Sequence, residues 1–276
     1  MNLIVLDYVS DLPHPAPGKR DELRGLPSPP MTYCLALRLE DSLIFVADTR
    51  TNAGLDNVGT YRKLHVIDAG PDRVFVMQSA GNLATTQEVL DRIDQDLKYP
   101  GEHESLATVT HLFEAALYLG RLSQGVVERH RAGLSRGNAD ATATFILGGQ
   151  IKDQPADILL VYPEGNYIRA SDDRPFLQIG ESKYGKFMLE LGIRAHVSGD
   201  KALKMALSSM VSTAHSNLSV GPPYDIAIYR YDSLTVDEYR IDIGSPYLQE
   251  LQATWIEQMV VAIDHLPPIT SSVFSP

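Results

Sequence analysis

The sequence predicts an α+β fold in which antiparallel sheets are covered on their outer faces by helices. Segments of strand character come in blocks separated by tight turns, and segments of helical periodicity come in pairs between those blocks. The chain has 276 residues, of which 44% are hydrophobic, enough to bury one large core. The order is strand block, helix pair, strand block, helix pair, hairpin and final helix, which antiparallel sheets with outer helices satisfy best.

The first strand block contains two hairpins. A strand at 32–39 turns at Glu40–Ser42 and returns through a strand at 42–48. The second hairpin joins strands at 63–67 and 73–79 through Gly70-Pro71-Asp72, residue types that favour a tight turn.

The first helix pair follows directly. Asn82 is a good N-cap, and the apolar residues after it recur at helical spacing until Pro100-Gly101 ends the helix. A second helix is predicted over 105–132, because its apolar residues lie broadly on one face.

The second half of the chain repeats this alternation. Four strands are predicted at 143–147, 157–161, 167–169 and 176–179. Two helices are predicted near 183–192 and 199–215, and two strands near 224–230 and 236–242. Ser245-Pro246 then begins a final helix with a single apolar stripe.

The two ends of the chain are set apart from the region of predicted strands and helices. Residues 1–31 carry six prolines and a mixed charge run and cannot build a core, so we expect a disordered extension, either a propeptide or the product of a wrongly assigned start codon. Met31 before the small Thr32 favours the second alternative, since initiator methionine is usually removed there. We expect one domain over 32–265 and a flexible tail over 266–276.

Composition excludes several classes of function. The net charge of −11 argues against nucleic-acid binding, which needs a basic face. No apolar run is long enough to span a membrane, and the start lacks a secretory signal. A single cysteine, Cys34, excludes an internal disulfide framework and favours a reducing cytoplasm. The histidines show no metal-ligand spacing, so no metal is expected.

Thr32 is the candidate nucleophile. A hydroxyl is a weak nucleophile until a base takes its proton, and the free α-amine of an N-terminal threonine is one such base. That amine has an unperturbed pKa of about 7.7–8.0, so part of it is neutral at cellular pH. The chemistry therefore depends on whether Thr32 becomes the first residue.

Two charged residues can support this threonine. Lys63 opens a strand that can lie beside the first hairpin, where its ammonium would lower the pKa of the amine and favour a deprotonated oxygen. Asp48 ends the second strand and could pair with Lys63 to hold it in place. Taken alone, each is an ordinary strand residue or half of a surface ion pair. Their joint spacing, together with the family resemblance that follows, carries the hypothesis.

The combined pattern resembles the active-site frame of proteasome β-subunits. It consists of Thr32, Asp48, Arg50, Lys63 and the turn Ser79-Ala80-Gly81. The sequence from Met31 to Val66, together with that from Ser79 to Val89, is most similar to the bacterial Anbu (ancestral β-subunit) branch. The resemblance extends from about Met31 to the final helix.

The resemblance implies a four-layer αββα sandwich of the N-terminal-nucleophile hydrolase type. It implies a threonine peptidase that acts on peptides or unfolded proteins, with the oxyanion held by the Gly81 N–H. Arg50, Thr51 and Asn52 would line the substrate cleft, where an extended peptide could add as a strand. The family also implies self-association into a ring or helical assembly, and no cofactor.

Supporting residues match the family less closely. Ser219 matches a supporting serine of the family, and Ser182, in Gly180-Glu181-Ser182-Lys183, matches another within one residue of register. Ser216 stands where the family carries an aspartate, so that negative charge is missing.

Two alternatives stay open beside the peptidase. One is an amidase acting on a small modified peptide, which a substrate profile would distinguish. The other is a catalytically weak assembly protein that binds peptides, which the missing aspartate at Ser216 favours and which a Thr32→Ala variant would test.

Overall fold

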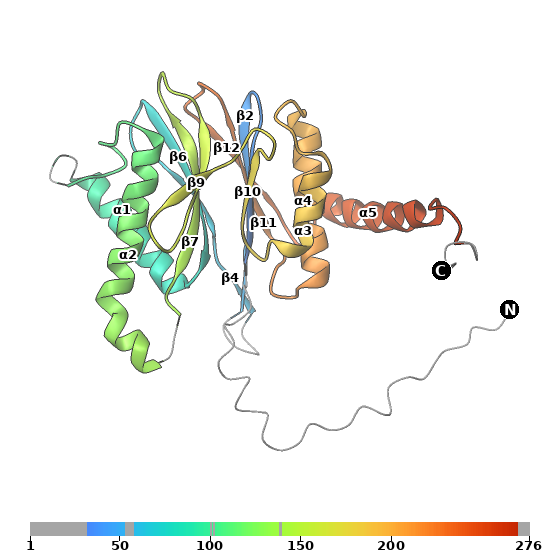
Figure 1. Cartoon of the computed structure of the whole chain (residues 1–276), viewed down its shortest axis with the longest axis horizontal. Coiled ribbons are helices and arrows are strands. Elements are labelled where there is room, and N and C mark those ends of the chain that lie inside the picture. Colours follow the sequence, from blue (N-terminus) through green and yellow to red (C-terminus); the bar gives the residue numbers. More distant parts are fainter. Residues whose placement is uncertain (1–31, 53–57, 100, 102, 138–139, 270–276) are drawn as a thin grey trace, which may run out of the picture.

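The computed structural model of the chain describes residues 32–52, 58–99, 101, 103–137 and 140–269 (Figure 1). The expectations for residues 1–31 and for 270–276 of the tail lie outside this part. Within it, the protein is a mixed α/β fold with antiparallel sheets, as the sequence predicts.

The described strands form two five-stranded antiparallel sheets and a two-stranded ribbon. The first sheet has the order β10 (Phe176–Gly180), β1 (Tyr33–Arg38), β2 (Ser42–Asp48), β11 (Tyr224–Arg230) and β12 (Val236–Ile241). The second has the order β5 (Leu64–Ile67), β6 (Arg73–Gly81), β7 (Ala143–Ile151), β8 (Asp157–Val161) and β9 (Tyr167–Arg169). The ribbon pairs β3 (Arg50–Asn52) with β4 (Val58–Thr60).

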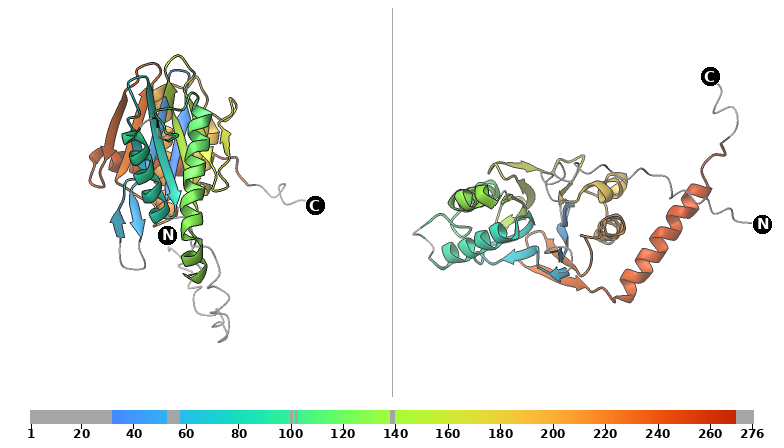
Figure 2. Two further views of the ribbon diagram at one scale, coloured as in Figure 1. Left: turned by 90° about the vertical axis from the view of Figure 1, so that its left-hand side faces the viewer. Right: turned by 90° about the horizontal axis from the view of Figure 1, so that it is seen from below.

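Helices lie on both outer faces, and the two sheets lie between them (Figures 1 and 2). The helices α1 (Leu83–Lys98) and α2 (Leu112–Gly137) pack on the second sheet, and α3 (Lys183–Gly192) and α4 (Gly199–Ser216) pack on the first. The last helix, α5 (Pro246–Asp264), contacts α4 and projects away from the body.

Three buried clusters explain why this arrangement forms. One fills the space between α1, α2 and the second sheet, and another the space between the first sheet and α3 and α4. The third lies between the two sheets and includes Cys34, Phe45 and Ile146. Strands with both faces covered need no polar alternation, which is why β1 and β2 are almost entirely buried.

The sequence misplaced the start of the second helix. The prediction began at 105, whereas α2 begins at Leu112. Glu114 accepts hydrogen bonds from the backbone N–H of Thr110 and of His111, which satisfies donors that the start of a helix leaves open. Ser105 and Thr108 bond to each other in a separate turn upstream. The short ribbon of β3 and β4 was not predicted.

Candidate active site

Thr32 lies directly before β1 and is buried, with 8% of its surface exposed. The pairing of β1 with β10 sets Tyr33 opposite Gly180. Beyond that pair, the backbone N–H of Glu181 donates to the carbonyl oxygen of Thr32 at 2.7 Å. Thr32 is therefore held by an antiparallel ladder at one edge of β1.

Asp48 lies on the other side of β1, at the end of β2. The register sets Cys34 opposite Ala47, so Asp48 falls beside Tyr33. One carboxylate oxygen, Oδ1, accepts the Tyr33 N–H at 3.0 Å, and the other, Oδ2, accepts the Gly221 N–H at 3.3 Å. The side chain is fully buried, which fixes its position one residue from Thr32.

Lys63 completes this group from the second sheet. Its Nζ donates to Asp48 Oδ1 at 2.8 Å and to the carbonyl oxygen of Arg50 at 2.6 Å, and the residue is only 5% exposed. Its own carbonyl oxygen accepts the Ser79 N–H at 3.0 Å, which fixes the start of β5 against β6. A single oxygen of Asp48 thus binds both the lysine ammonium and the amide next to Thr32.

The electrostatics of this pair follow from burial. Desolvation raises the pKa of Asp48 above its ordinary value, and the Lys63 ammonium opposes that rise, helped by the amides of Tyr33 and Gly221. A buried ion pair contributes little to stability relative to apolar residues, but it fixes geometry. The pair therefore holds the Lys63 ammonium beside the start of β1.

Gly81 lies where β6 ends and α1 begins. Its φ of +110° suits glycine, and a Cβ there would lie 2.4 Å from the carbonyl oxygen of Thr142. Asn82 caps α1 by accepting the Thr85 N–H at 3.1 Å. Ser79, two residues earlier, is bonded to Lys63, so the strand that carries Gly81 reaches the same group.

The predicted cleft residues fall in β3. Arg50 turns its guanidinium toward the loop before β11, where it donates to the carbonyl oxygen of Leu218 at 2.9 Å and packs over Gly221. The Thr51 hydroxyl oxygen is buried and has no hydrogen-bond partner within the described part of the chain. The backbone of Asn52 pairs with Val58 in the ribbon.

The three supporting serines are placed differently from one another. Ser182 is the N-cap residue of α3, and no hydrogen bond from its side chain caps that helix. Ser219 is half-buried, and its N–H donates to the side chain of Asn217 at 2.9 Å. Ser216 is exposed and donates to the Ser212 carbonyl within its own helix at 3.1 Å.

Two residues that the sequence analysis did not single out lie beside this group. Glu181 is buried, and its Oε2 accepts a hydrogen bond from the Asn217 amide at 3.1 Å. The sequence contains one signal, since Glu181 directly precedes Ser182, the predicted supporting serine. Its pairing with Asn217 joins positions 36 residues apart and follows no local pattern.

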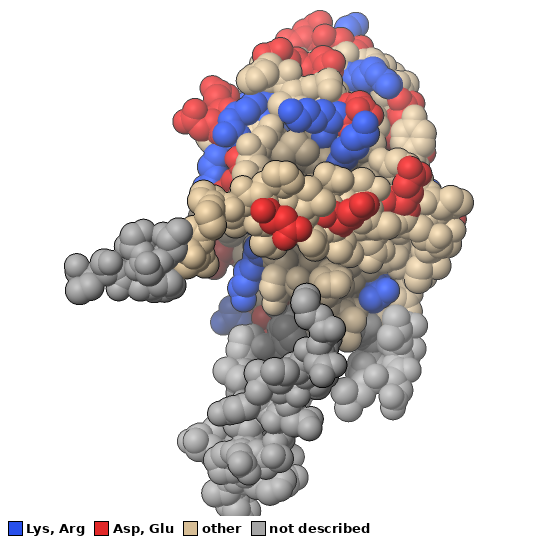
Figure 3. Space-filling view, turned by 90° about the vertical axis from the view of Figure 1, so that its right-hand side faces the viewer, with Lys and Arg blue, Asp and Glu red and all other residues tan. Residues whose placement is uncertain are grey.

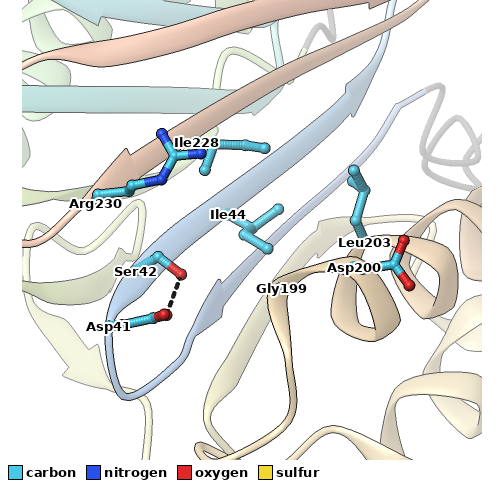
Figure 4. Close-up of a pocket in the computed structure, with 8 residues that line it drawn as sticks. All are labelled: Asp41, Ser42, Ile44, Gly199, Asp200, Leu203, Ile228 and Arg230. Carbon is cyan, nitrogen blue, oxygen red and sulfur yellow. Dashed lines mark hydrogen bonds between the residues drawn. The ribbon is translucent and has the colours of Figure 1, made fainter.

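A hollow of about 280 Å³ lies apart from this group. It is lined by the turn before β2, the first residues of β2, the start of α4, and Ile228 and Arg230 of β11 (Figure 4). Asp48 ends β2, and the residues of that strand that line the hollow, Ser42 and Ile44, lie about 13–20 Å from it along the strand. The hollow therefore does not belong to the Thr32 group.

The described residues contain no cluster of three or more histidine, cysteine, aspartate or glutamate residues that could hold a metal ion. None of their helices is long and apolar enough to cross a membrane.

Solved structures resemble this chain over most of its length. Anbu (ancestral β-subunit) from Yersinia bercovieri is 41% identical, with a TM-score of 0.80, and the match covers 87% of this chain and 99% of that one. Anbu from Pseudomonas aeruginosa, solved as a helical assembly, is 38% identical with a TM-score of 0.82 and covers the same shares. Anbu from Hyphomicrobium sp. strain MC1 is 40% identical with a TM-score of 0.77, covering 87% and 100%. No protein-family model and no curated protein sequence matches.

Fold and similarity together define the class as proteasome β-subunit-like. Within that class, the chain belongs to the Anbu family, the ancestral β-subunit branch, as the resemblance in the sequence indicated.

Proposed function

We propose that this protein is a threonine peptidase in which Thr32, as the first residue of the mature chain, is the nucleophile. The observation that carries the proposal is the shared Asp48 oxygen, which binds the Lys63 ammonium and the backbone amide next to Thr32. The layering of helices and sheets supports assignment to the four-layer αββα type of N-terminal-nucleophile hydrolases. The substrate class is a peptide or an unfolded protein.

In the proposed reaction, the α-amine takes the proton of the Thr32 hydroxyl as Oγ attacks the peptide carbonyl carbon. The nearby Lys63 ammonium favours a neutral amine and stabilises the developing negative charge on Oγ. The Gly81 N–H donates to the oxyanion, an interaction typically worth about 10²–10³ in rate. The tetrahedral intermediate then expels the leaving amine, which takes the proton from the α-ammonium. Water hydrolyses the resulting ester by the same proton transfers.

The test needs protein whose first residue is Thr32, established by intact mass and N-terminal sequencing. We expect hydrolysis of fluorogenic peptides and a covalent adduct at Thr32 with an electrophilic peptide ketone. Thr32→Ser should keep part of the activity, whereas Thr32→Ala should lose it. Equal rates for Thr32→Ala and the parent protein would exclude the mechanism.

The same experiment separates the alternatives. Turnover of small modified peptides or amides without hydrolysis of longer peptides would support the amidase. Peptide binding that Thr32→Ala leaves intact, with no hydrolysis by either protein, would support a catalytically weak assembly protein. The cytoplasm is the predicted compartment in each case.

We further propose that the protein self-associates through α5. This helix is anchored on one side, where Leu248 is buried and the Trp255 Nε1 donates to the Ser212 hydroxyl at 3.0 Å. Another stripe, formed by Ile256, Val260 and Ile263, is exposed. Figure 3 shows a band of mainly uncharged residues across this face of the molecule, interrupted by acidic side chains.

The proposed occupant of the stripe is a second copy of this chain. An Anbu relative was solved as a helical assembly, and an exposed apolar stripe on a projecting helix is typical of an interface. Val260→Glu should reduce the assembly mass measured by analytical ultracentrifugation, whereas Thr254→Glu, on the opposite face of α5, should not. Unchanged mass for Val260→Glu would place the contact elsewhere.

A further inference from the structure

Glu181 is a buried acid placed directly against Thr32. The register of β1 and β10 pairs Tyr33 with Gly180, so the next pair is Thr32 with Glu181, and the bond from the Glu181 N–H to the Thr32 carbonyl follows that register. Side chains directly opposite in an antiparallel pair lie on one face, with Cβ atoms about 4.5–5.5 Å apart. The Glu181 side chain therefore starts within reach of the Thr32 side chain and amine.

The close approach is enforced by Gly180. Its φ is +81°, and a Cβ at this position would lie 1.9 Å from the Thr32 carbonyl oxygen. Only glycine allows the turn before Glu181 to come this close to Thr32.

One carboxylate oxygen of Glu181 has a defined partner. The carbonyl oxygen of the Asn217 side chain accepts the Ser219 N–H at 2.9 Å, so its amide group must be the part that faces Glu181. That amide donates to Glu181 Oε2 at 3.1 Å. Asn217 is itself fixed at the end of α4 by its N–H, which donates to the Thr213 carbonyl at 2.8 Å.

The other oxygen, Oε1, is buried and has no hydrogen-bond partner among the described residues. Glu181 is 5% exposed, and no ion pair to it occurs in the same part of the chain. A buried carboxylate oxygen without a donor is costly, so such an oxygen in a fold calls for a donor from a ligand or a changed chain terminus.

We propose that Glu181 Oε1 accepts a hydrogen bond from the α-amine of Thr32 when Thr32 is the first residue. This inference rests on the proposed function and adds a further catalytic residue to it. The Asp48–Lys63 pair is neutral as a whole, so Glu181 supplies the negative charge that balances the α-ammonium formed when the amine takes the hydroxyl proton. In this proposal, Glu181 supplies the negative charge that the family's aspartate would supply at the position of Ser216.

The two sides of Thr32 then act on the amine in opposite directions. Lys63 lowers the proton affinity of the amine and Glu181 raises it, which keeps the pKa of the base near the working pH, where a general base is most effective. The Asn217 amide orients the carboxylate for this contact.

The test measures the pKa of the Thr32 α-amine directly, by competitive acetylation at a series of pH values with quantification of the N-terminal peptide by mass spectrometry. Glu181→Gln should lower that pKa by about 1–3 units, the usual effect of removing an adjacent opposite charge. Glu190→Gln, an exposed acid of α3 that pairs with Arg174 and Lys186, should leave it unchanged. Glu181→Asp, which keeps the charge, should shift it less than Glu181→Gln.

Peptide hydrolysis is measured on the same proteins. Glu181→Gln should lower kcat and move the acidic limb of the pH profile, with a smaller effect on KM. An unchanged α-amine pKa in a folded Glu181→Gln protein overturns the inference, even if Thr32-dependent hydrolysis is found. A shifted pKa without any hydrolysis supports the Glu181 contact and removes the peptidase proposal instead. If Glu181→Gln does not fold, Glu181→Ala, which also removes the charge, is measured in its place, and an α-amine pKa and pH profile identical to those of the parent overturn the inference.

Discussion

Asp48 and Glu181 are both buried carboxylates beside Thr32, on opposite edges of β1, yet their surroundings differ. Asp48 accepts hydrogen bonds from two backbone amides and the Lys63 ammonium. Glu181 accepts one from Asn217 and has an oxygen with no donor among the described residues. A carboxylate whose oxygens are engaged acts as a fixed part of the fold, while an unused buried oxygen marks a place where another group is expected to bind.

The largest loss of stability is expected from replacing Lys63, the cation that Asp48 binds. Lys63→Met leaves Asp48 buried without its cation, and breaking a buried pair in this way costs about 3–5 kcal/mol. Urea unfolding measures the loss. Lys186→Met, which removes an exposed partner of Glu190, should cost less than about 1 kcal/mol. A loss below about 1 kcal/mol for Lys63→Met would mean that buried Asp48 does not need this cation.

Gly180→Ala tests how tightly the other side is held. Alanine would have a positive φ and a Cβ on the Thr32 carbonyl, so we expect a loss of about 1–3 kcal/mol and lower kcat. Gly199→Ala is the matched control, since a Cβ there would meet no atom within 4 Å. Equal stability and kcat for the two variants would show that Thr32 and Glu181 are not held by this turn.

Neighbouring residues at the end of α4 sharpen the comparison further. Asn217→Ala removes the described donor to Glu181, with an expected loss of about 1–3 kcal/mol for the unsatisfied carboxylate. Ser216→Ala should stay within about 0.5 kcal/mol, because its side chain is exposed and bonds within the helix. Thermal unfolding measures both losses. A larger loss for Ser216→Ala than for Asn217→Ala would show that Ser216, and not Asn217, supports this side of the site.

The smallest effect is a pH dependence on the Lys63 side. Burial lowers the pKa of His65 below its ordinary value of 6.5, and the hydrogen bond to the Arg62 carbonyl opposes this shift. Because the unfolded chain binds the proton more readily, His65 favours folding above pH 6.5, and that contribution is lost as pH falls toward the lowered value. His65→Gln should reduce this slope in urea unfolding. The charges of Arg62, Asp225 and Asp94 also act on the ring. An unchanged slope would show that the pH dependence does not come from His65.

Local patterns in the sequence were sufficient for one side of this comparison. Asp48 and Lys63 stand at strand ends, and strand periodicity with two hairpins was enough to predict their pairing. Glu181 could not be found in this way, because its role depends on β1 pairing with β10, which lies about 145 residues later in the chain. Its tetrapeptide was read for serine, and a glutamate before a helix has an ordinary solvent-exposed interpretation.

The element boundaries show the same limit. The strands of both sheets were predicted from alternation and turn residues, whereas the start of α2 was set by a side chain that reaches back to Thr110 and His111. The strands of the ribbon, β3 and β4, have only three residues each, too few for an alternating pattern to show in the sequence.

The one cysteine of the chain sits between the two sheets, where Cys34 is fully buried and burial raises its pKa. A thiol reagent in solution can therefore reach it only when the sheets come apart. The rate at which the reagent labels Cys34 therefore measures how often the sheets separate. The measurement needs no engineered cysteine.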